Sequence, residues 1–600
     1  MVFRTHLAAW LLSAGIVSIS AGSALAVEPS DVLLPASVKA YVSVPDMEEL
    51  LARWDATQLG AMAKDPAMQP FVKDLQKQFH DRLTQTGRRL GLTFEDLKGV
   101  YAGEVATAVL FLPEHETQKH AVVLMSDVTG KEMEARALLK KVDDDMTARS
   151  ATRSTRTASG IEQIIYTLPR REGWPTEYAV YFIAEDQLVA VDRVDLAANI
   201  AARYTKASED TLASLPAYKR AMAECAEDAG DLAPHLRWFL EPFGYVDANR
   251  AASGGRKKRG KDILAVLRNQ GFGAIGGAGG YVTLDTADRE LPYRAFVGAP
   301  PDPKGEDRFR LAARMLQFPN GGDLHPYRWI PADSSSYGSF NGKFKEAFEF
   351  CASLVNELAG DTVFEDILRS LKEDPNGPRI DVRAELIAHL LERAVVISDY
   401  TLPITPQSER LLGGVAIANP KAVADAVERA MESDPQAKRH DYKDHVIWEI
   451  IAVVEEEVPG LEIEGFGLGE EEEEEEKAVL INHCITVAFG HLIVSTHLDY
   501  IKKVIDEAAD GNSLGTQPDY LAVSTALDAL GAGGDKCARM FGRTDEQYRT
   551  TYQLLKEGKM PESESMFGRV LNQVLGPEEE GVVRKQAIDG KLMPEFDAIR

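Results

Sequence analysis

The feature that most constrains the fold of this chain is an internal repeat with a very long period. LPASVKAYVSVPD at Leu34–Asp46 returns as IPADSSSYGSFNG at Ile330–Gly342, with Tyr41 matching Tyr337. Solenoid repeats have roughly 20–45 residues, so this period is far too long for a solenoid. The repeat therefore predicts two related halves.

Three further matches keep the same order along the chain. They pair Ala121–Val142 with Leu411–Met431, Gln187–Tyr204 with His491–Ala508, and Thr211–Tyr218 with Ser513–Tyr520. Matches that recur in one order indicate an internal duplication.

Each half has the pattern of an α+β fold. In the first half the runs rich in Val, Ile and aromatic residues predict strands at 40–44, 105–112, 121–125, 163–168, 178–183 and 188–191, followed by a mainly helical tail. Tight turns such as Ala184-Glu185-Asp186 favour antiparallel pairing. Asp195 and Asp499 each follow a strand-like run and are predicted as N-caps. We expect two pseudo-symmetric lobes, each an antiparallel or mixed sheet covered by helices.

The domain boundaries follow from composition. We expect a signal peptide at 1–26, a first lobe at 27–300, a linker at 301–327 rich in Pro and Gly with one short helix at 308–316, and a second lobe at 328–600. The helix at 262–268 leads into predicted strands at 281–284 and 293–297, whereas its apparent counterpart EFDAIR ends the printed chain. Either the second lobe lacks its last hairpin, which raises the question of whether the chain is full length, or the first half donates those strands across the interface between the lobes.

The opening residues predict export. A short basic start with Arg4 and His6 precedes an apolar run at 7–19 and the small-residue signal Ala24-Leu25-Ala26. The apolar run is shorter than the roughly 20 residues that cross a bilayer, and no later run is long enough. We expect a mature protein without a transmembrane segment, located in the periplasm or secreted.

Charge and cysteine usage exclude some functional classes. The formal net charge is -27, and such an acidic surface repels phosphate backbones, so nucleic acid is not an expected partner. Cys225, Cys351, Cys484 and Cys537 lie far apart in the sequence, which argues against a disulfide scaffold and a CxxC metal motif but leaves their pairing open.

Two groups of residues are weak candidates for metal binding, although no cofactor is expected. His483, His491 and His497 lie close together in sequence but lack an established zinc spacing. Glu470, Glu473 and Glu476 belong to a run of seven glutamates whose hard oxygen ligands suit calcium, although a solvated insert is the simpler interpretation.

No catalytic motif stands out. Cys484 follows His483 directly, and neighbouring strand residues point to opposite faces, so the pair predicts no activated thiol. GFGAIG at 271–276 has a helix before it and a strand after it, the reverse of a dinucleotide-binding loop, and is predicted as a turn. The apolar strands show no concentrated set of polar interruptions, so no catalytic residues are predicted.

With the strand entry LPASVKAYVSVPD, the segment DPAMQPF, the strand QLVAVDRVD and the later LPAY, the chain resembles a family of large exported proteins of planctomycete-type bacteria, of unknown function and with an internally duplicated domain. The resemblance covers most of the mature chain and implies export and a repeated domain. It carries over no catalytic residues.

The sequence favours an exported, non-enzymatic protein that binds or scaffolds an envelope or extracellular protein partner. Two alternatives remain open: a periplasmic hydrolase or metal-dependent enzyme, and a small-ligand carrier with an apolar cavity between its lobes.

Overall fold

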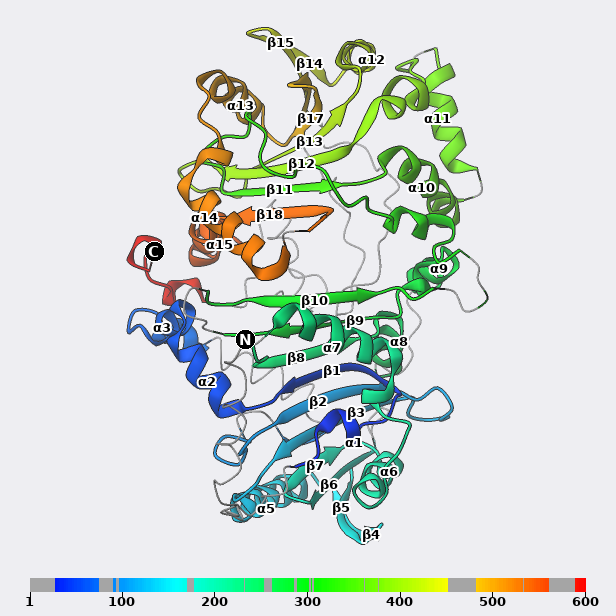
Figure 1. Cartoon of the computed structure of the whole chain (residues 1–600), viewed down its shortest axis with the longest axis vertical. Coiled ribbons are helices and arrows are strands. Elements are labelled where there is room, and N and C mark those ends of the chain that lie inside the picture. The colour runs from blue at the N-terminus through cyan, green and yellow to red at the C-terminus, as the bar shows by residue number, and fades with distance from the viewer. Residues whose placement is uncertain are drawn as a thin grey trace, which may run out of the picture.

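The computed structural model of the chain describes residues 27–74, 90–92, 96–169, 177–230, 232–252, 262–284, 289–301, 304, 307–360, 362–375, 377–451, 482–532, 534–560 and 589–599. Two lobes lie one above the other along the longest axis, each built on an antiparallel sheet with helices beside it (Figure 1). This confirms the predicted α+β class with two lobes. The predicted signal peptide lies outside the described residues.

The first lobe alternates strands and helices. Its strands are β1 (Val38–Val44), β2 (Val105–Phe111), β3 (His120–Asp127), β4 (Thr152–Ala158), β5 (Ile161–Thr167), β6 (Tyr178–Ala184), β7 (Gln187–Val191), β8 (Leu236–Leu240), β9 (Gly277–Val282) and β10 (Tyr293–Gly298). Its helices are α1 (Ser30–Leu33), α2 (Met47–Ala56), α3 (Gln58–Lys64), α5 (Glu132–Ala148), α6 (Val194–Thr205), α7 (Pro216–Ala229), α8 (Pro242–Ala252) and α9 (Ile263–Asn269).

The second lobe repeats this alternation. Its strands are β11 (Ser336–Asn341), β12 (Leu390–Tyr400), β13 (Glu409–Ile417), β14 (Ala437–Tyr442), β15 (His445–Ile451), β16 (Asn482–Ala488), β17 (His491–Ser495) and β18 (Ala538–Gly542). Its helices are α10 (Phe344–Ala359), α11 (Val363–Glu373), α12 (Pro420–Ser433), α13 (Leu498–Asp510), α14 (Pro518–Leu527) and α15 (Thr544–Glu557).

The two sheets share one strand order. The first runs β10-β9-β8-β1-β2-β3-β7-β6-β5-β4, and the second, from its inner edge, runs β18-β11-β12-β13-β17-β16-β15-β14. The eight strands of the second sheet thus correspond in order to β8 and β1–β7, while β9 and β10 extend the first sheet beyond β8. Within the described residues, the second sheet has no strand beyond β18.

Matching hairpins close both halves of the repeat. Glu185 and Asp186 link β6 to β7 with φ angles of 46° and 59°, and Phe489 and Gly490 link β16 to β17 with φ angles of 53° and 72°. Two successive positive φ angles are typical of the type I′ turn, whose twist suits a two-residue hairpin. The predicted turn at 184–186 is confirmed.

Each sheet is covered on both faces. In the first lobe, Val123 and Met125 of β3 pack with α6 residues in one core, while Leu124 packs with α5 residues in a separate core. In the second lobe, α13 contributes to one core and α12 to another. Alternating side chains of a strand face opposite sides of a sheet, so each lobe has three layers.

The predicted N-caps are wrong by two residues. The N-caps of α6 and α13 are Arg193 and His497, and Asp195 and Asp499 lie in the first helical turn. A carboxylate in the first turn is still favourable because it faces the positive end of the helix dipole. Asp195 accepts hydrogen bonds from Arg193, and Asp499 accepts one from Arg410.

Two strands of the first lobe differ from expectation, β4 because it lacks an apolar run and β8 because its short apolar run lies in a stretch predicted as helical. Strand β4 carries the polar sequence TRSTRTA at the sheet edge, and β8 lies in the predicted helical tail. The crossing between the lobes contains a 3₁₀ helix at Leu311–Leu316, slightly shorter than predicted. GFGAIG is the predicted turn, between α9 and β9, and EFDAIR contains only a 3₁₀ turn at Phe596–Ala598.

Across the described part of the chain, no helix combines the length and apolarity that a membrane crossing requires.

Candidate functional site

The three histidines predicted as weak metal ligands lie at separate places in the second lobe. His483 lies near the start of β16, His491 begins β17, and His497 precedes α13. Since Cys484 pairs with Ser495 while His491 pairs with Ala488, His491 lies at the opposite end of this hairpin from the other two. Four residues along a strand correspond to about 13 Å, too far for shared metal coordination.

His491 is a packing residue in an aromatic cluster. Its ring lies 4.7 Å from the ring of Tyr327 and 5.1 Å from that of Trp329, measured between centroids. Its Nδ1 lies 2.8 Å from the carbonyl oxygen of Phe489. Burial lowers the pKa of His491, which keeps the imidazole neutral near pH 7.

His497 has both ring nitrogens engaged. Nδ1 lies 2.8 Å from Oγ1 of Thr496, and Nε2 lies 2.9 Å from the carbonyl oxygen of Gln407. Burial also lowers the pKa of half-buried His483. Among the described residues, no three His, Cys, Asp or Glu side chains are grouped so that they could hold a metal ion. Glu470, Glu473 and Glu476 lie outside the described residues, so calcium binding there stays a prediction.

The four cysteines are free thiols in this structure. Cys484 is buried in the core of the second lobe, and burial raises its pKa to about 12. A thiol with so high a pKa stays protonated and is a poor nucleophile.

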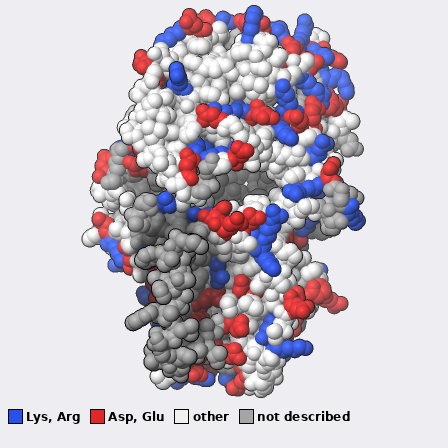
Figure 2. All heavy atoms as spheres, viewed as in Figure 1, with Lys and Arg blue, Asp and Glu red and all other residues white. Residues whose placement is uncertain are grey.

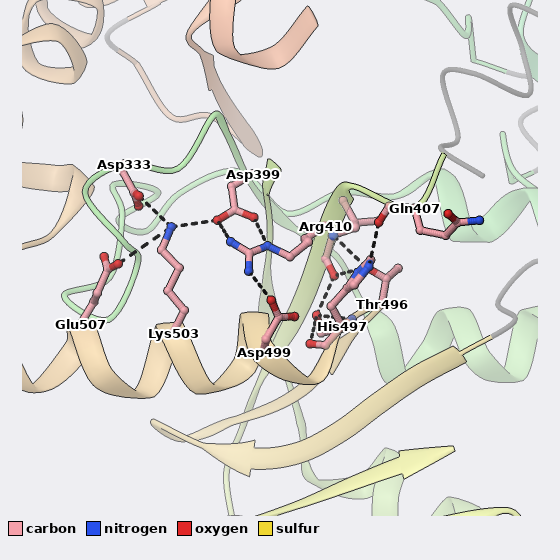
Figure 3. A network of polar contacts seen from close by, with 11 residues as sticks. Asp333, Asp399, Gln407, Arg410, Thr496, His497, Asp499, Lys503 and Glu507 are labelled. Atoms are coloured by element: carbon pink, nitrogen blue, oxygen red, sulfur yellow. Dashed lines mark hydrogen bonds and ion pairs between the residues drawn. The ribbon is translucent and has the colours of Figure 1, made fainter. Parts of the chain in front are cut away.

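A buried ion network lies in the second lobe (Figure 3). Arg410 of β13 donates two hydrogen bonds to Asp399 of β12, with Nε 2.7 Å from Oδ1 and Nη2 2.6 Å from Oδ2. Its Nη1 lies 2.7 Å from Oδ2 of Asp499. Asp399 is 5% exposed and Arg410 is 7% exposed.

Lys503 of α13 extends this network toward the surface. Its Nζ lies 2.8 Å from Oδ2 of Asp399, 2.7 Å from Oδ2 of Asp333 and 3.9 Å from Oε1 of Glu507. The ammonium therefore neutralises the carboxylate that Arg410 also binds.

The charges hold one another in their ionised forms. Burial by itself would lower the pKa of Arg410, but hydrogen bonds and charge from Asp399, together with Asp499, raise it. Burial likewise opposes ionisation of Lys503, yet Asp399 and Asp333 raise its pKa. A lysine with a raised pKa is neither a general base nor a nucleophile near pH 7. The network is built to hold β12, β13 and α13 together.

This network corrects one expectation from the sequence. Asp399 and Arg410 do interrupt apolar strands of one lobe, as a catalytic set would. Their side chains, however, form a buried pair and hydrogen-bond to each other.

A second polar network lies at the same place in both lobes, around paired tyrosines. In the first lobe, Glu104 accepts hydrogen bonds through Oε1 from Ser43 Oγ at 2.5 Å, Ser30 Oγ at 3.0 Å and Arg237 Nη2 at 3.1 Å. Tyr41 Oη also lies 3.3 Å from this oxygen. Ser43 has an exposed fraction of 0%, so its hydroxyl cannot meet a substrate.

The second lobe keeps most of these residues but reverses the central charge. The strand register matches Tyr41, Ser43 and Arg237 with Tyr337, Ser339 and Arg539. The register of β2 and β12 then matches Glu104 with Arg393.

Arg393 holds its neighbours as a donor. Its Nε lies 3.0 Å from Ser339 Oγ, its Nη2 lies 3.2 Å from Tyr337 Oη, and its guanidinium lies 3.8 Å from the ring centroid of Tyr327. One scaffold position thus carries an acceptor in one lobe and a donor in the other.

A polar cavity of about 350 Å³ lies beside this network in the second lobe. It is lined by the segment 321–325, by Asp528 and by residues 534–536 and Arg539. Asp528 accepts from Lys536 and Arg539, both at 2.9 Å, so these three charged residues of the lining are paired with one another. This cavity is not the large apolar space between the lobes that would favour a carrier.

On the face shown in Figure 2, acidic and basic side chains of the described residues are interspersed, without one continuous basic patch.

Comparisons with protein-family models, with curated proteins and with solved structures find no match for this chain. The resemblance to large exported planctomycete-type proteins therefore stays a prediction.

Sequence reasoning missed Asp399, Arg410, Glu104 and Arg393. The strand register places the first two where the first half has Leu110 and Ala121, a correspondence that becomes visible only once the sheets are known. Charged residues at positions that are apolar in the other half mark a local change of environment. Glu104 and Arg393 lie just before apolar runs, where a charge is ordinary.

Proposed function

We propose that this chain is an exported, non-enzymatic protein that binds another protein in the periplasm or outside the cell. The apolar opening of the sequence supports export. The internal pairing of both polar networks supports a binding role, because their charged groups serve the fold and leave no activated nucleophile or base.

The observation that carries the proposal is an exposed apolar surface on the first lobe. In α2, no residue is buried, and Leu51 and Trp54 are 45% and 37% exposed. Leu59 of α3 is 42% exposed and Tyr293 of β10 is 73% exposed.

A hydrogen bond joins the start of α3 to the segment just before β10. The backbone N–H of Gln58, at the start of α3, donates to Oε1 of Glu290 at 2.5 Å, three residues before Tyr293. Exposed apolar side chains that gather on adjoining elements commonly mark an interaction site. Leu291, two residues before Tyr293, is 41% exposed as well. We call Leu51, Trp54, Leu59, Leu291 and Tyr293 the apolar surface.

The two lobes support a further part of this proposal, that they arose by duplication. Eight strands in the same order, with matching hairpins and matching tyrosine networks, are the structural result expected of a repeated domain. The divergence between the lobes then lets one lobe bind while the other has a different task.

The test is crosslinking in intact cells that express the full chain with its signal peptide, followed by purification and mapping of the crosslinked residues. We expect a reproducible protein partner whose crosslinks map near α2, α3 and β10. A double variant, Leu51→Ser with Trp54→Ser, is expected to lose this partner while its unfolding midpoint stays unchanged.

Met133→Ser is the matched control, because Met133 is 81% exposed on α5 and lies outside the apolar surface. It should retain the partner. The proposal is wrong if no protein is crosslinked, or if the double variant and the control behave alike.

A further inference from the structure

The edges of the two sheets are protected unequally. The outer edges, β4 and β14, carry charged residues, with Arg153 and Arg156 on β4 and Lys438, Arg439 and Asp441 on β14. Charges on an edge strand discourage pairing with another chain. The outer edges are therefore less suited to strand addition.

The inner edges lack this protection on their exposed faces. Strand β10 exposes Tyr293, Ala295 and Val297, with Tyr293 and Val297 at 73% and 61%. Its single charge, Arg294, turns the other way and donates through Nε to the carbonyl oxygen of Asp228 at 2.7 Å. On β18 the exposed side chains are Ala538 and Met540, the latter at 74%, while Arg539 is buried against Ser524 and Asp528.

The backbone of β10 has donors and acceptors that point away from its sheet. The backbone N–H of Thr283 donates to the carbonyl oxygen of Pro292 at 2.9 Å, and the next pair along the two strands is Tyr293 with Val282. Because ladder bonds alternate in antiparallel pairs, Arg294 and Phe296 bond to β9, and the N–H groups of Tyr293, Ala295 and Val297 point outward.

The position of β10 in the molecule limits the size of a partner that could pair with it. It is the strand of the first sheet nearest the second lobe, and β18 is the strand of the second sheet nearest the first (Figure 1). A second copy of this chain would have to bring a whole sheet edge to a place that the second lobe flanks. A single extended segment requires far less room.

The net charge of the chain favours a partner segment of one sign. The chain carries a formal net charge of -27, so its field attracts basic segments and repels acidic ones.

We propose that β10 accepts an extended segment of a partner protein as an added strand, with apolar residues at alternate positions and Lys or Arg at its ends. The added strand continues the first sheet beyond its inner edge and places its apolar side chains beside Tyr293 and Val297. Main-chain hydrogen bonds supply affinity and the alternate side chains supply specificity. This inference rests on the proposed function and specifies its mode of binding.

The test uses a synthetic probe peptide of alternating Val and Thr, about as long as β10, with two Lys at each end. Binding to the full mature chain is measured by fluorescence anisotropy at low salt. We expect saturable binding that weakens for the same peptide with Glu in place of Lys.

Ala295→Pro is the decisive variant, because it removes an outward N–H and leaves the ladder to β9 intact. We expect its affinity for the probe to fall by at least about tenfold, equal to about 1.4 kcal/mol. Ala295→Val, which keeps the N–H, is expected to bind as the wild type does. Equal binding by Ala295→Pro and the wild type, or no binding by the wild type, overturns the proposal.

Hydrogen exchange on the wild type tests the proposal without relying on the folding of a variant. In the wild type, the amides of Tyr293, Ala295 and Val297 should exchange fast without the probe and slowly with it, while Arg294 and Phe296 stay slow in both states. Slow exchange at all five amides without the probe also overturns the proposal.

The two proposals fail differently. A partner crosslinked at the apolar surface that still binds Ala295→Pro contradicts strand addition and leaves the proposed function standing. The absence of any crosslinked partner contradicts the proposed function itself.

Discussion

At one pair of equivalent buried positions, the first lobe has two apolar residues and the second lobe has an ion pair. Tyr41 faces Ala108 and Tyr337 faces Ile397, so the register matches the pair Leu110 and Ala121 with the pair Asp399 and Arg410. Leu110 and Ala121 are both fully buried in the first lobe. The fold thus accepts either an apolar pair or a hydrogen-bonded ion pair here, which indicates that the strand order does not require the charges.

The apolar pair and the ion pair also differ in how many partner residues each requires. An apolar pair needs only a good fit, whereas a buried ion pair needs every partner in place. The second lobe supplies Lys503, Asp499 and Asp333 for this purpose, whereas Asp195, the first-lobe counterpart of Asp499, binds Arg193.

The largest expected effect comes from breaking the ion pair at one end. Asp399→Ala leaves Arg410 buried without its bidentate partner and removes one acceptor of Lys503. We expect the free energy of unfolding of the second lobe to fall by about 3–5 kcal/mol, measured by chemical denaturation. Asp333→Ala, at the exposed end of the network, should cost less than about 1 kcal/mol. Equal losses for both variants would contradict the network as described.

Transplanting the apolar pair of the first lobe sharpens the comparison. Asp399→Leu with Arg410→Ala removes both buried charges together, while Lys503 keeps Asp333 and Glu507 as partners. Replacing a buried ion pair by apolar residues is often neutral or stabilising by about 1–4 kcal/mol. We expect the double variant to be at least as stable as the wild type in the same denaturation assay. A double variant as unstable as Asp399→Ala would show that the second lobe depends on the charges.

The tyrosine networks test the positions that the lobes share. Tyr41 Oη lies 2.8 Å from Ser30 Oγ, and Tyr337 Oη donates to the carbonyl oxygen of Leu324 at 2.8 Å. Removing either hydroxyl loses hydrogen bonds of similar quality, so Tyr41→Phe and Tyr337→Phe should each cost about 1 kcal/mol of unfolding free energy. A cost confined to one lobe would contradict the equivalence of the two networks.

The smallest effect concerns pH. His491 lies where the first lobe has Gln187, and burial lowers its pKa in the folded state. The unfolded chain then binds more protons below its ordinary pKa of about 6.5, so the second lobe loses stability as pH falls below that value.

His491→Gln installs the residue of the first lobe and should flatten this pH dependence, measured as the unfolding midpoint between about pH 5 and 7. Because His483 shares the lowered pKa, some slope should remain. An unchanged slope in His491→Gln would contradict the assignment to His491.

The sequence predicted the elements that have a clear period and missed those that do not. Strands such as β2 and β6 have apolar runs, and the repeat led to two lobes of one type. Strand β4 could not be recognised because an exposed edge strand of Thr, Arg and Ser has no apolar face. The N-caps were misplaced because Arg193 and His497 are unusual cap residues.

The polar networks could not be predicted from one sequence for a physical reason. Asp399 and Arg410 are eleven residues apart on neighbouring strands, and only the register of β12 and β13 brings them together. Register depends on the fold of the whole sheet, so no local pattern reveals the pair. Glu104 likewise meets Arg237 only after β1, β2 and β8 assemble.

The central claim is that the charged networks hold the fold and that the protein works through its surface. The most direct measurement is crosslinking in intact cells with the variant Asp399→Leu with Arg410→Ala, in parallel with the wild type. We predict that the folded variant captures the same partner, with crosslinks at the same positions near α2, α3 and β10. Loss of the partner by a variant of unimpaired stability would contradict the account, because it would show that the buried charges take part in function.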